Sequence, residues 1–306
     1  MYLKKVCIFL AAAFFVLDLM FFLMYMSMRN NMQKISGEMI DNAVAYFDKN
    51  GVAVNASVIP DKVPDNPIYS FASYDEDLYE AVSEKISSEY YPLCQSLSAI
   101  ETPDGIVYSV SDDSSAKAHI RFYSDSFAFE YSTEEYEESG IGPLGSDKFE
   151  TDSKEISDKE KKALERFIGT VSYAKNQSYD IVGVSLKDTG VYISVTQNAY
   201  GNYPIEDNYA NVLISDGTVK YACGKWISRE YKKSYSEPLT DGVNALKNMD
   251  ISDATAILSE RIVYRHRYAG NDTNYLIPVW EIVYLDNIGS VNTQYIDAIK
   301  DQIVNK

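Results

Sequence analysis

The chain has 306 residues, of which 46% are hydrophobic and 24% are charged, and its formal net charge at pH 7 is −17. Because so acidic a chain repels phosphate backbones and anionic lipid headgroups, we expect no nucleic-acid partner. Three cysteines exclude a scaffold held together mainly by disulfides, and the apolar content is sufficient for a real core.

An apolar run, Val6–Met28, begins the chain and exceeds the roughly 20 residues that a helix needs to cross a bilayer. The residues after Phe21 are bulky and offer no small-residue cleavage site, so the run is interpreted as an uncleaved signal-anchor. Lys4 and Lys5 precede it, which places the tail, residues 1–5, in the cytoplasm by the positive-inside rule. We therefore expect a single-pass cell-membrane protein with an extracellular C-terminal ectodomain.

Asp18 is the one charged residue in this run. An aspartate at the bilayer centre costs roughly 2.5–3.5 kcal/mol on insertion scales, and such residues usually pair with a partner. We therefore predict that Asp18 and its neighbours Leu17 and Leu19 contact a partner helix. The alternative is an unpaired Asp18, protonated or hydrated by local thinning of the bilayer, that only weakens the anchor.

Two helices are predicted at the start of the ectodomain. Residues 34–50 carry an apolar stripe with helical spacing, and Gly51 follows as the expected stop. A second helix, residues 75–90, ends before Pro92. The side chains expected to point inward are Ile35, Met39, Ile40, Ala43, Val44 and Phe47 in the first helix, and Leu78, Val82 and Ile86 in the second.

The next region alternates apolar and polar residues, which predicts strands at 106–110, 118–123 and 127–131. Residues 132–153 are rich in Glu, Gly and Ser and are expected to form a surface loop or domain junction. Ser157 and Glu160 have the spacing of a capping box at the start of a helix. The expected buried face of that helix consists of Leu164, Phe167, Ile168 and Val171.

The C-terminal half repeats the order of helix followed by strands. Asp216 and Gly217 form the strongest hairpin signal, and a short helix is expected at 241–249. Strands are predicted at residues 179–186, 191–196, 209–215, 218–222, 260–268, 275–284 and 293–299. We therefore expect an α+β ectodomain of two modules, residues 29–150 and 151–306, with helices packed on antiparallel sheets.

Candidate catalytic residues are few. His266 lies among apolar residues of its strand and is expected in the core or at its rim, whereas His119 is expected to face solvent. Cys94 and Cys223 lack metal-ligand spacing and could at most form one disulfide. The glutamates of residues 134–138 are adjacent on a polar segment, where a solvated surface is expected. We predict no enzyme activity, no cofactor and no metal.

Two other features concern binding and packing. Arg261, Arg265 and Arg267 share one face of a strand, and we name them the basic ridge, a possible site for an anionic ligand or partner. Internal pairing with the surplus carboxylates is the alternative. Trp280 is expected to be a core residue.

Several stretches resemble YycI, a membrane-anchored regulatory protein family of low-GC Gram-positive bacteria that is related to YycH. They are Phe15–Phe21, Lys49–Val52 with the following Val58-Ile59-Pro60 and Val63-Pro64, the Pro-x-Trp strand Leu276–Ile282, and Tyr295–Ala298.

This resemblance implies an anchored modulator of the essential cell-wall sensor histidine kinase. Family members contact the kinase through their transmembrane helix, beside a companion YycH-type protein, and their two-module ectodomain is not an enzyme fold. The expected partners are therefore the kinase, the companion protein and, through residues 6–28, the lipid bilayer. The alternative is an anchored ligand-binding or inhibitory module with no kinase partner; a cell-wall hydrolase with an unrecognised site is a weaker one.

Overall fold

The structure is a computed structural model of the chain. It describes residues 14–24, 34–63, 68–72, 76–94, 96–113, 115–123, 128–138, 156–172, 178–187, 189–199, 203–228, 230–235, 238–268 and 273–299.

The chain divides into two compact units that are each built from separate stretches of sequence. Unit 1 consists of Met1–Asn66, Ser236–Ile262 and Pro278–Lys306, and unit 2 consists of Pro67–Tyr235 and Val263–Ile277. This division differs from the expected modules, residues 29–150 and 151–306. The reason lies in strand pairing, because β6 (Ala128–Thr133) pairs with β10 (Thr218–Lys225) across the expected boundary.

Residues 14–24 are helical, and their side chains are exposed. In the part of the chain that the structure describes, no helix has both the length and the apolar character needed to cross a membrane. Residues 6–13 and 25–28 of the expected anchor lie outside the described residues, as do Lys4 and Lys5.

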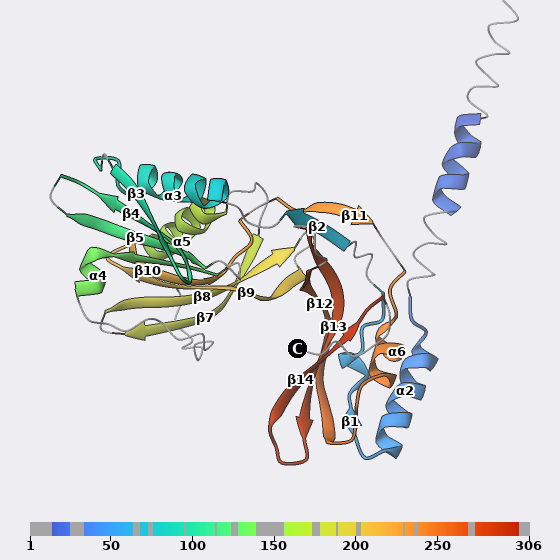
Figure 1. Ribbon diagram of the computed structural model, residues 1–306. Helices are drawn as coiled ribbons and strands as arrows, with labels where there is room; N and C mark the ends of the chain where they lie inside the picture. Colours follow the sequence, from blue (N-terminus) through green and yellow to red (C-terminus); the bar gives the residue numbers. More distant parts are fainter. Residues whose placement is uncertain are drawn as a thin grey trace, which may run out of the picture. The chain divides into compact units, whose positions relative to one another are not determined.

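Unit 2 is built on an antiparallel sheet in which the strands follow the order β7-β8-β9-β10-β6-β5-β4-β3 (Figure 1). Besides β6 and β10, its strands are β3 (Ser96–Thr102), β4 (Gly105–Ser111), β5 (Ala116–Tyr123), β7 (Ser178–Lys187), β8 (Gly190–Ala199) and β9 (Tyr203–Ser215). The short strands β2 (Ile68–Ala72) and β11 (Lys232–Tyr235) pair with each other. The sequence pattern did not predict β2, β3 or β11.

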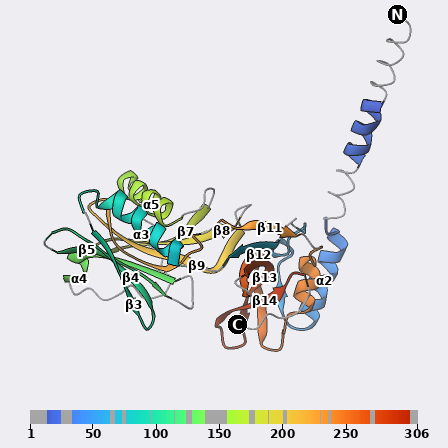
Figure 2. The same cartoon turned by 45° about the horizontal axis from the view of Figure 1, so that its top comes forward.

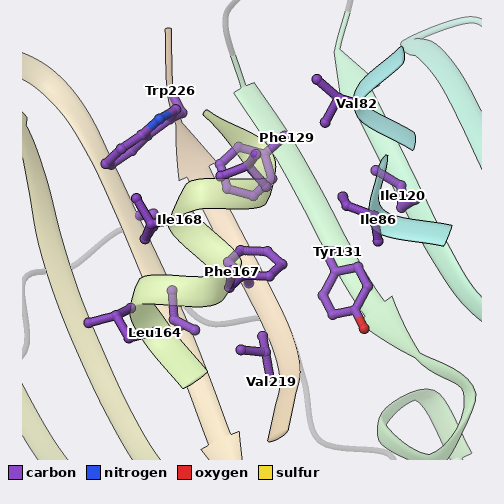
Figure 3. Close-up of a cluster of buried hydrophobic side chains, with 14 of the residues drawn as sticks. Val82, Ile86, Ile120, Phe129, Tyr131, Leu164, Phe167, Ile168, Val219 and Trp226 are labelled. Carbon is purple, nitrogen blue, oxygen red and sulfur yellow. The ribbon is translucent and has the colours of Figure 1, made fainter. Parts of the chain in front are cut away.

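Two helices, α3 (Glu76–Tyr90) and α5 (Asp158–Val171), lie together on one face of this sheet (Figures 1 and 2). Figure 3 shows Leu164, Phe167 and Ile168 of α5 near Tyr131 of β6 and Val219 of β10. These side chains are almost completely buried. The predicted inner faces of both helices are therefore confirmed, and they supply the core of unit 2.

Local sequence signals determine where several elements begin and end. The Ser157 hydroxyl accepts from the Glu160 backbone and the Glu160 carboxylate accepts from the Ser157 backbone, which confirms the capping box. Asp216 and Gly217 have φ of 55° and 71° and join β9 to β10, as a tight hairpin turn of type I′ requires. Gly51 ends its helix with φ of 81°.

Unit 1 packs helix α2 (Gly37–Lys49) and the short helix α6 (Gly242–Lys247) with strands. Ala43 and Phe47 of α2 are buried as expected, but Met39 is exposed. Unit 1 also contains β1 (Ala53–Val54), the 3-10 turn η1 (Ala56–Val58) and β14 (Val291–Asp297). Two long strands, β12 (Ala254–Tyr268) and β13 (Thr273–Asp286), contribute residues to both units. β14 pairs antiparallel with β13, and β1 pairs parallel with β12. The expected α+β class is confirmed.

Glu260 is a buried carboxyl group of unit 1, with only 6% of its surface exposed. It lies against the start of α6, where a Cβ atom on Gly242 would come within 3.0 Å of a carboxyl oxygen. Neither oxygen has a hydrogen-bond partner among the described residues. Burial, aided by the nearby Asp241 carboxylate, raises the pKa of Glu260 to about 9. The folded chain therefore holds this group protonated at neutral pH.

The stability of the chain should therefore fall as the pH rises from about 4.5 to 9. In the unfolded chain the Glu260 carboxyl returns to its ordinary pKa of 4.5, so between these values unfolding releases a proton. The free energy of unfolding then decreases by about 1.4 kcal/mol per pH unit from this group. Glu260→Gln removes this titration. The free energy of unfolding of the variant minus that of the parent, measured by urea unfolding, should therefore increase between pH 6 and pH 8.

The exposed Asp253 serves as the control, and Asp253→Asn should differ from the parent by the same small amount at both pH values. A constant difference between Glu260→Gln and the parent across this range would contradict the assignment.

Candidate functional site

The sheet of unit 2 has an outer face, on the side opposite α3 and α5. Side chains alternate along β5, so that Ile120 and Phe122 point into the core, whereas His119 and Arg121 point to the outer face. The alternation that buries one row of β5 therefore places polar and charged groups on the other side.

A cleft of about 380 Å³ lies on this outer face. Two cross-strand rows from β4, β5 and β6 line it: Ser109, His119 and Ser132 in one, and Val107, Arg121 and Glu130 in the other. Ile100 and Thr102 of β3 complete the lining. The cleft thus combines hydroxyl groups, an imidazole, one ion pair and a small apolar wall, and we name it the outer-face cleft.

Glu130 organises the charges of the outer-face cleft. Its carboxylate accepts hydrogen bonds from the hydroxyl groups of Tyr123, at 3.0 Å, and Tyr221, at 2.9 Å. The nearest guanidinium nitrogen of Arg121 lies 3.8 Å away, too far for a direct hydrogen bond. Burial raises the pKa of Tyr221 far above its ordinary value, so its hydroxyl remains a donor. Internal donors therefore occupy both oxygens of Glu130.

Arg121 and His119 are the other ionisable groups of the cleft. A hydrogen bond with Tyr123 is the main cause that raises the pKa of Arg121, with a smaller contribution from Glu130, so the guanidinium is always charged. Its side chain is 47% exposed and can be reached from solvent. The Nδ1 atom of His119 lies 2.9 Å from the hydroxyl oxygen of Ser109, which orients the ring. The site can therefore donate and accept hydrogen bonds.

Helix α4 (Glu134–Glu138) covers the neighbouring part of the outer face. The ring of Tyr136 stacks on Tyr221 with ring centroids 4.7 Å apart, and both pack with Tyr192 and Leu213. Cys223 lies beside this aromatic cluster, and burial raises the pKa of its thiol to about 11. The thiol therefore stays protonated at neutral pH, which disfavours attack by its sulfur. None of the residues of the aromatic cluster lines the outer-face cleft.

The predicted partner-contact residues are exposed on the helix of residues 14–24. Leu17 and Leu19 expose about half of their surface, and Asp18 between them is also exposed. Their contact with a partner helix stays a prediction.

The basic ridge is divided between the two units. Arg261, in unit 1, is exposed and forms an ion pair with Glu281, so internal pairing occurs at this position. Arg265 and Arg267 belong to unit 2 and are half-buried. Binding of an anionic partner by the ridge stays a prediction.

The remaining candidates have structural roles with one exception. His266 is half-buried, with Nε2 2.8 Å from the side-chain oxygen of Asn208, which confirms its place at the rim of the core. Trp280 is completely buried and donates to the carbonyl of Thr240 at 2.9 Å, as expected of a core residue. His119 is the exception, because it lies half-buried in the outer-face cleft rather than simply in solvent.

Cys94 and Cys223 are not joined by a disulfide, so the bridge that the sequence permits is absent from the structure. The glutamates expected on a loop, residues 134–138, form helix α4 instead. Within the described ranges no group of three or more His, Cys, Asp or Glu side chains could hold a metal ion.

The sequence contains only part of the signal for the outer-face cleft. The polar positions Lys117, His119 and Arg121 alternate with apolar ones along β5, which indicates a polar outer face. The cross-strand partners of this row come from β4 and β6, and β10 adds Tyr221 beyond β6. No sequence pattern indicates that Glu130 and Tyr221 would lie near this row.

Comparisons with known proteins concern the fold. No family model and no curated protein matches the sequence. The structure is similar to the crystal structure of an uncharacterized protein from Eubacterium rectale, with 12% sequence identity, 83% of this chain and 90% of that chain covered, and a TM-score of 0.52. A second similar structure is the C-terminal domain of Bacillus megaterium YpeB, with 13% identity, 77% and 97% coverage, and a TM-score of 0.39. The first similarity shows that the two chains share a fold.

Removing the carboxylate of Glu130 should destabilise the chain. In Glu130→Leu the hydroxyl of Tyr221, a residue only 2% exposed, loses its acceptor, which costs about 1–3 kcal/mol. Urea unfolding measures the loss. The matched control is Glu135→Leu, because the Glu135 side chain is 77% exposed and leaves no buried hydroxyl without its acceptor when it is removed. Loss of its ion pair with Lys220 should change the stability by less than about 0.5 kcal/mol. Equal effects of the two variants would contradict the role of Glu130.

Proposed function

We propose that this chain is a membrane-anchored, extracytoplasmic regulator of a two-component sensor histidine kinase that controls cell-wall metabolism. It acts on the kinase through its transmembrane helix and its ectodomain, beside a companion YycH-type protein. The resemblance of Phe15–Phe21 and Leu276–Ile282 to YycI supports this proposal.

The observation that carries the proposal is the helix of residues 14–24. Its large apolar side chains are about half exposed or more, from Leu19 at 47% to Phe15 at 69%. Apolar area exposed to water costs roughly 25 cal/mol per Å², so a continuous apolar helix favours a lipid or protein environment. Asp18 is the single charge among these side chains, and a carboxylate in that environment favours a polar partner.

Regulation by such a helix requires a difference in affinity. A partner can shift the kinase between two signalling states only by binding one state more tightly than the other. A contact at Asp18 that forms in one state alone would supply this difference, and the apolar side chains of Leu17 and Leu19 would pack beside it.

The outer-face cleft favours a second candidate function, an anchored ligand-binding module whose helix serves only to retain it at the membrane. In that case the cleft of about 380 Å³ would be the functional centre and the helix sequence would be interchangeable. The two functions therefore differ in what a change at Asp18 does.

Asp18→Leu in the full-length chain, expressed in its own bacterium, should change the output of a kinase-dependent reporter gene about fivefold or more, because typical coupling free energies correspond to changes of at least that size. Asp18→Asn is the matched control, since it keeps a hydrogen-bonding group at the same position and should retain most of the parent output. Protease protection in intact cells checks that both variants are folded and equally placed. Unchanged output in Asp18→Leu would refute the regulatory proposal and favour the ligand-binding module.

A further inference from the structure

We propose that the outer-face cleft of unit 2 binds a neutral, hydroxyl-rich ligand of the carbohydrate class. This inference rests on the geometry of β3 to β6 and does not depend on the anchor or on a kinase.

The hydrogen-bonding groups of the cleft suit a ligand that both donates and accepts. Three hydroxyl side chains line it, those of Thr102, Ser109 and Ser132, together with the imidazole of His119. The Thr102 hydroxyl donates to the Gly105 carbonyl, so its oxygen offers an acceptor, and the hydroxyl of Ser109 shares one hydrogen bond with Nδ1 of His119. A hydroxyl group can donate and accept, and a sugar presents several such groups on one ring. Hydroxyl, imidazole and guanidinium side chains in one cleft therefore match the chemistry of a polyol better than that of an apolar ligand.

The charges of the cleft disfavour an ionic ligand. Arg121 and Glu130 have opposite charges and lie 3.8 Å apart, so the lining is close to neutral. A cationic ligand would be repelled by Arg121, whereas Glu130 is already occupied by the hydroxyls of Tyr123 and Tyr221. An anion would have to approach a chain with a net charge of −17 and enter beside the carboxylate of Glu130. A neutral ligand avoids both costs.

The apolar wall and the size of the cleft fit the same class of ligand. Ile100 and Val107 are paired in register on β3 and β4, and Ile100 is 60% exposed. Together they offer a small apolar surface to the C–H face of a sugar ring. A volume of about 380 Å³ lies within the range of about 300–1,000 Å³ that is typical of small-molecule sites, which favours a short oligosaccharide.

The test is isothermal titration calorimetry of the full-length chain in nanodiscs with five tetrasaccharides. Maltotetraose, cellotetraose and tetra-N-acetylchitotetraose are neutral, tetraglucosamine is cationic and tetragalacturonate is anionic. We expect at least one neutral probe to bind at concentrations up to about 10 mM, which nearly saturates a site with a Kd of about 1 mM. Neither charged probe should bind as tightly.

Variants then locate the binding. Arg121→Met should lower the affinity for the neutral probe about tenfold. Ile100→Ser, at an exposed position, should also lower this affinity without affecting folding. The matched control is Lys117→Met, because Lys117 lies on the same strand but pairs with Asp112 and Glu134 outside the cleft.

The proposal is overturned if no neutral probe binds, if a charged tetrasaccharide binds more tightly, or if Lys117→Met weakens binding as much as the cleft variants do. Thermal melting monitored by circular dichroism separates a loss of binding from a loss of structure. A negative result in the binding experiment does not change the reporter output expected of Asp18→Leu, so the two proposals are tested separately.

Discussion

Helices α3 and α5 bury one face of the antiparallel sheet of unit 2, and the organisation of that unit depends on this contact. Leu164 and Phe167 of α5 and Ile86 of α3 are almost completely buried there. Each such side chain contributes about 1.5–3 kcal/mol on burial, and a one-residue shift of a strand would turn its apolar side chains away from the helices. The contact therefore fixes the register of the strands beneath it.

A fixed register determines the outer face as well. Because β5 must direct Ile120 and Phe122 to the helices, it must direct His119 and Arg121 to the opposite side. Pairing with β6 then places Glu130 beside Arg121, and pairing of β6 with β10 brings the Tyr221 hydroxyl to the same carboxylate. The outer-face cleft is thus a consequence of the core, and α4 limits it by covering the adjacent aromatic cluster.

Much of this fold can be predicted from local patterns. The capping box of Ser157, the turn at Asp216 and Gly217 and the helical spacing of Leu164 and Phe167 each depend on residues close together in sequence, and each is confirmed. Strand β3 lacks such a signal because it lies at the edge of the sheet and most of its side chains are exposed, so that burial imposes little alternation on it. The division into units also has no local signal, since it follows from pairings between distant strands.

The sequence by itself determined the α+β class, the inner faces of the helices, the buried position of Trp280 and the apolar helix with Asp18, because periodicity, turn chemistry and hydropathy act over a few residues. Only the tertiary structure decided that Arg261 pairs with Glu281, that no disulfide joins Cys94 to Cys223, and that His119 faces a cleft. It also placed the carboxyl of Glu260 in the interior of unit 1. These outcomes depend on which strands become neighbours. The burial of whole sheet and helix faces decides that pairing, and it cannot be predicted from a short stretch of sequence.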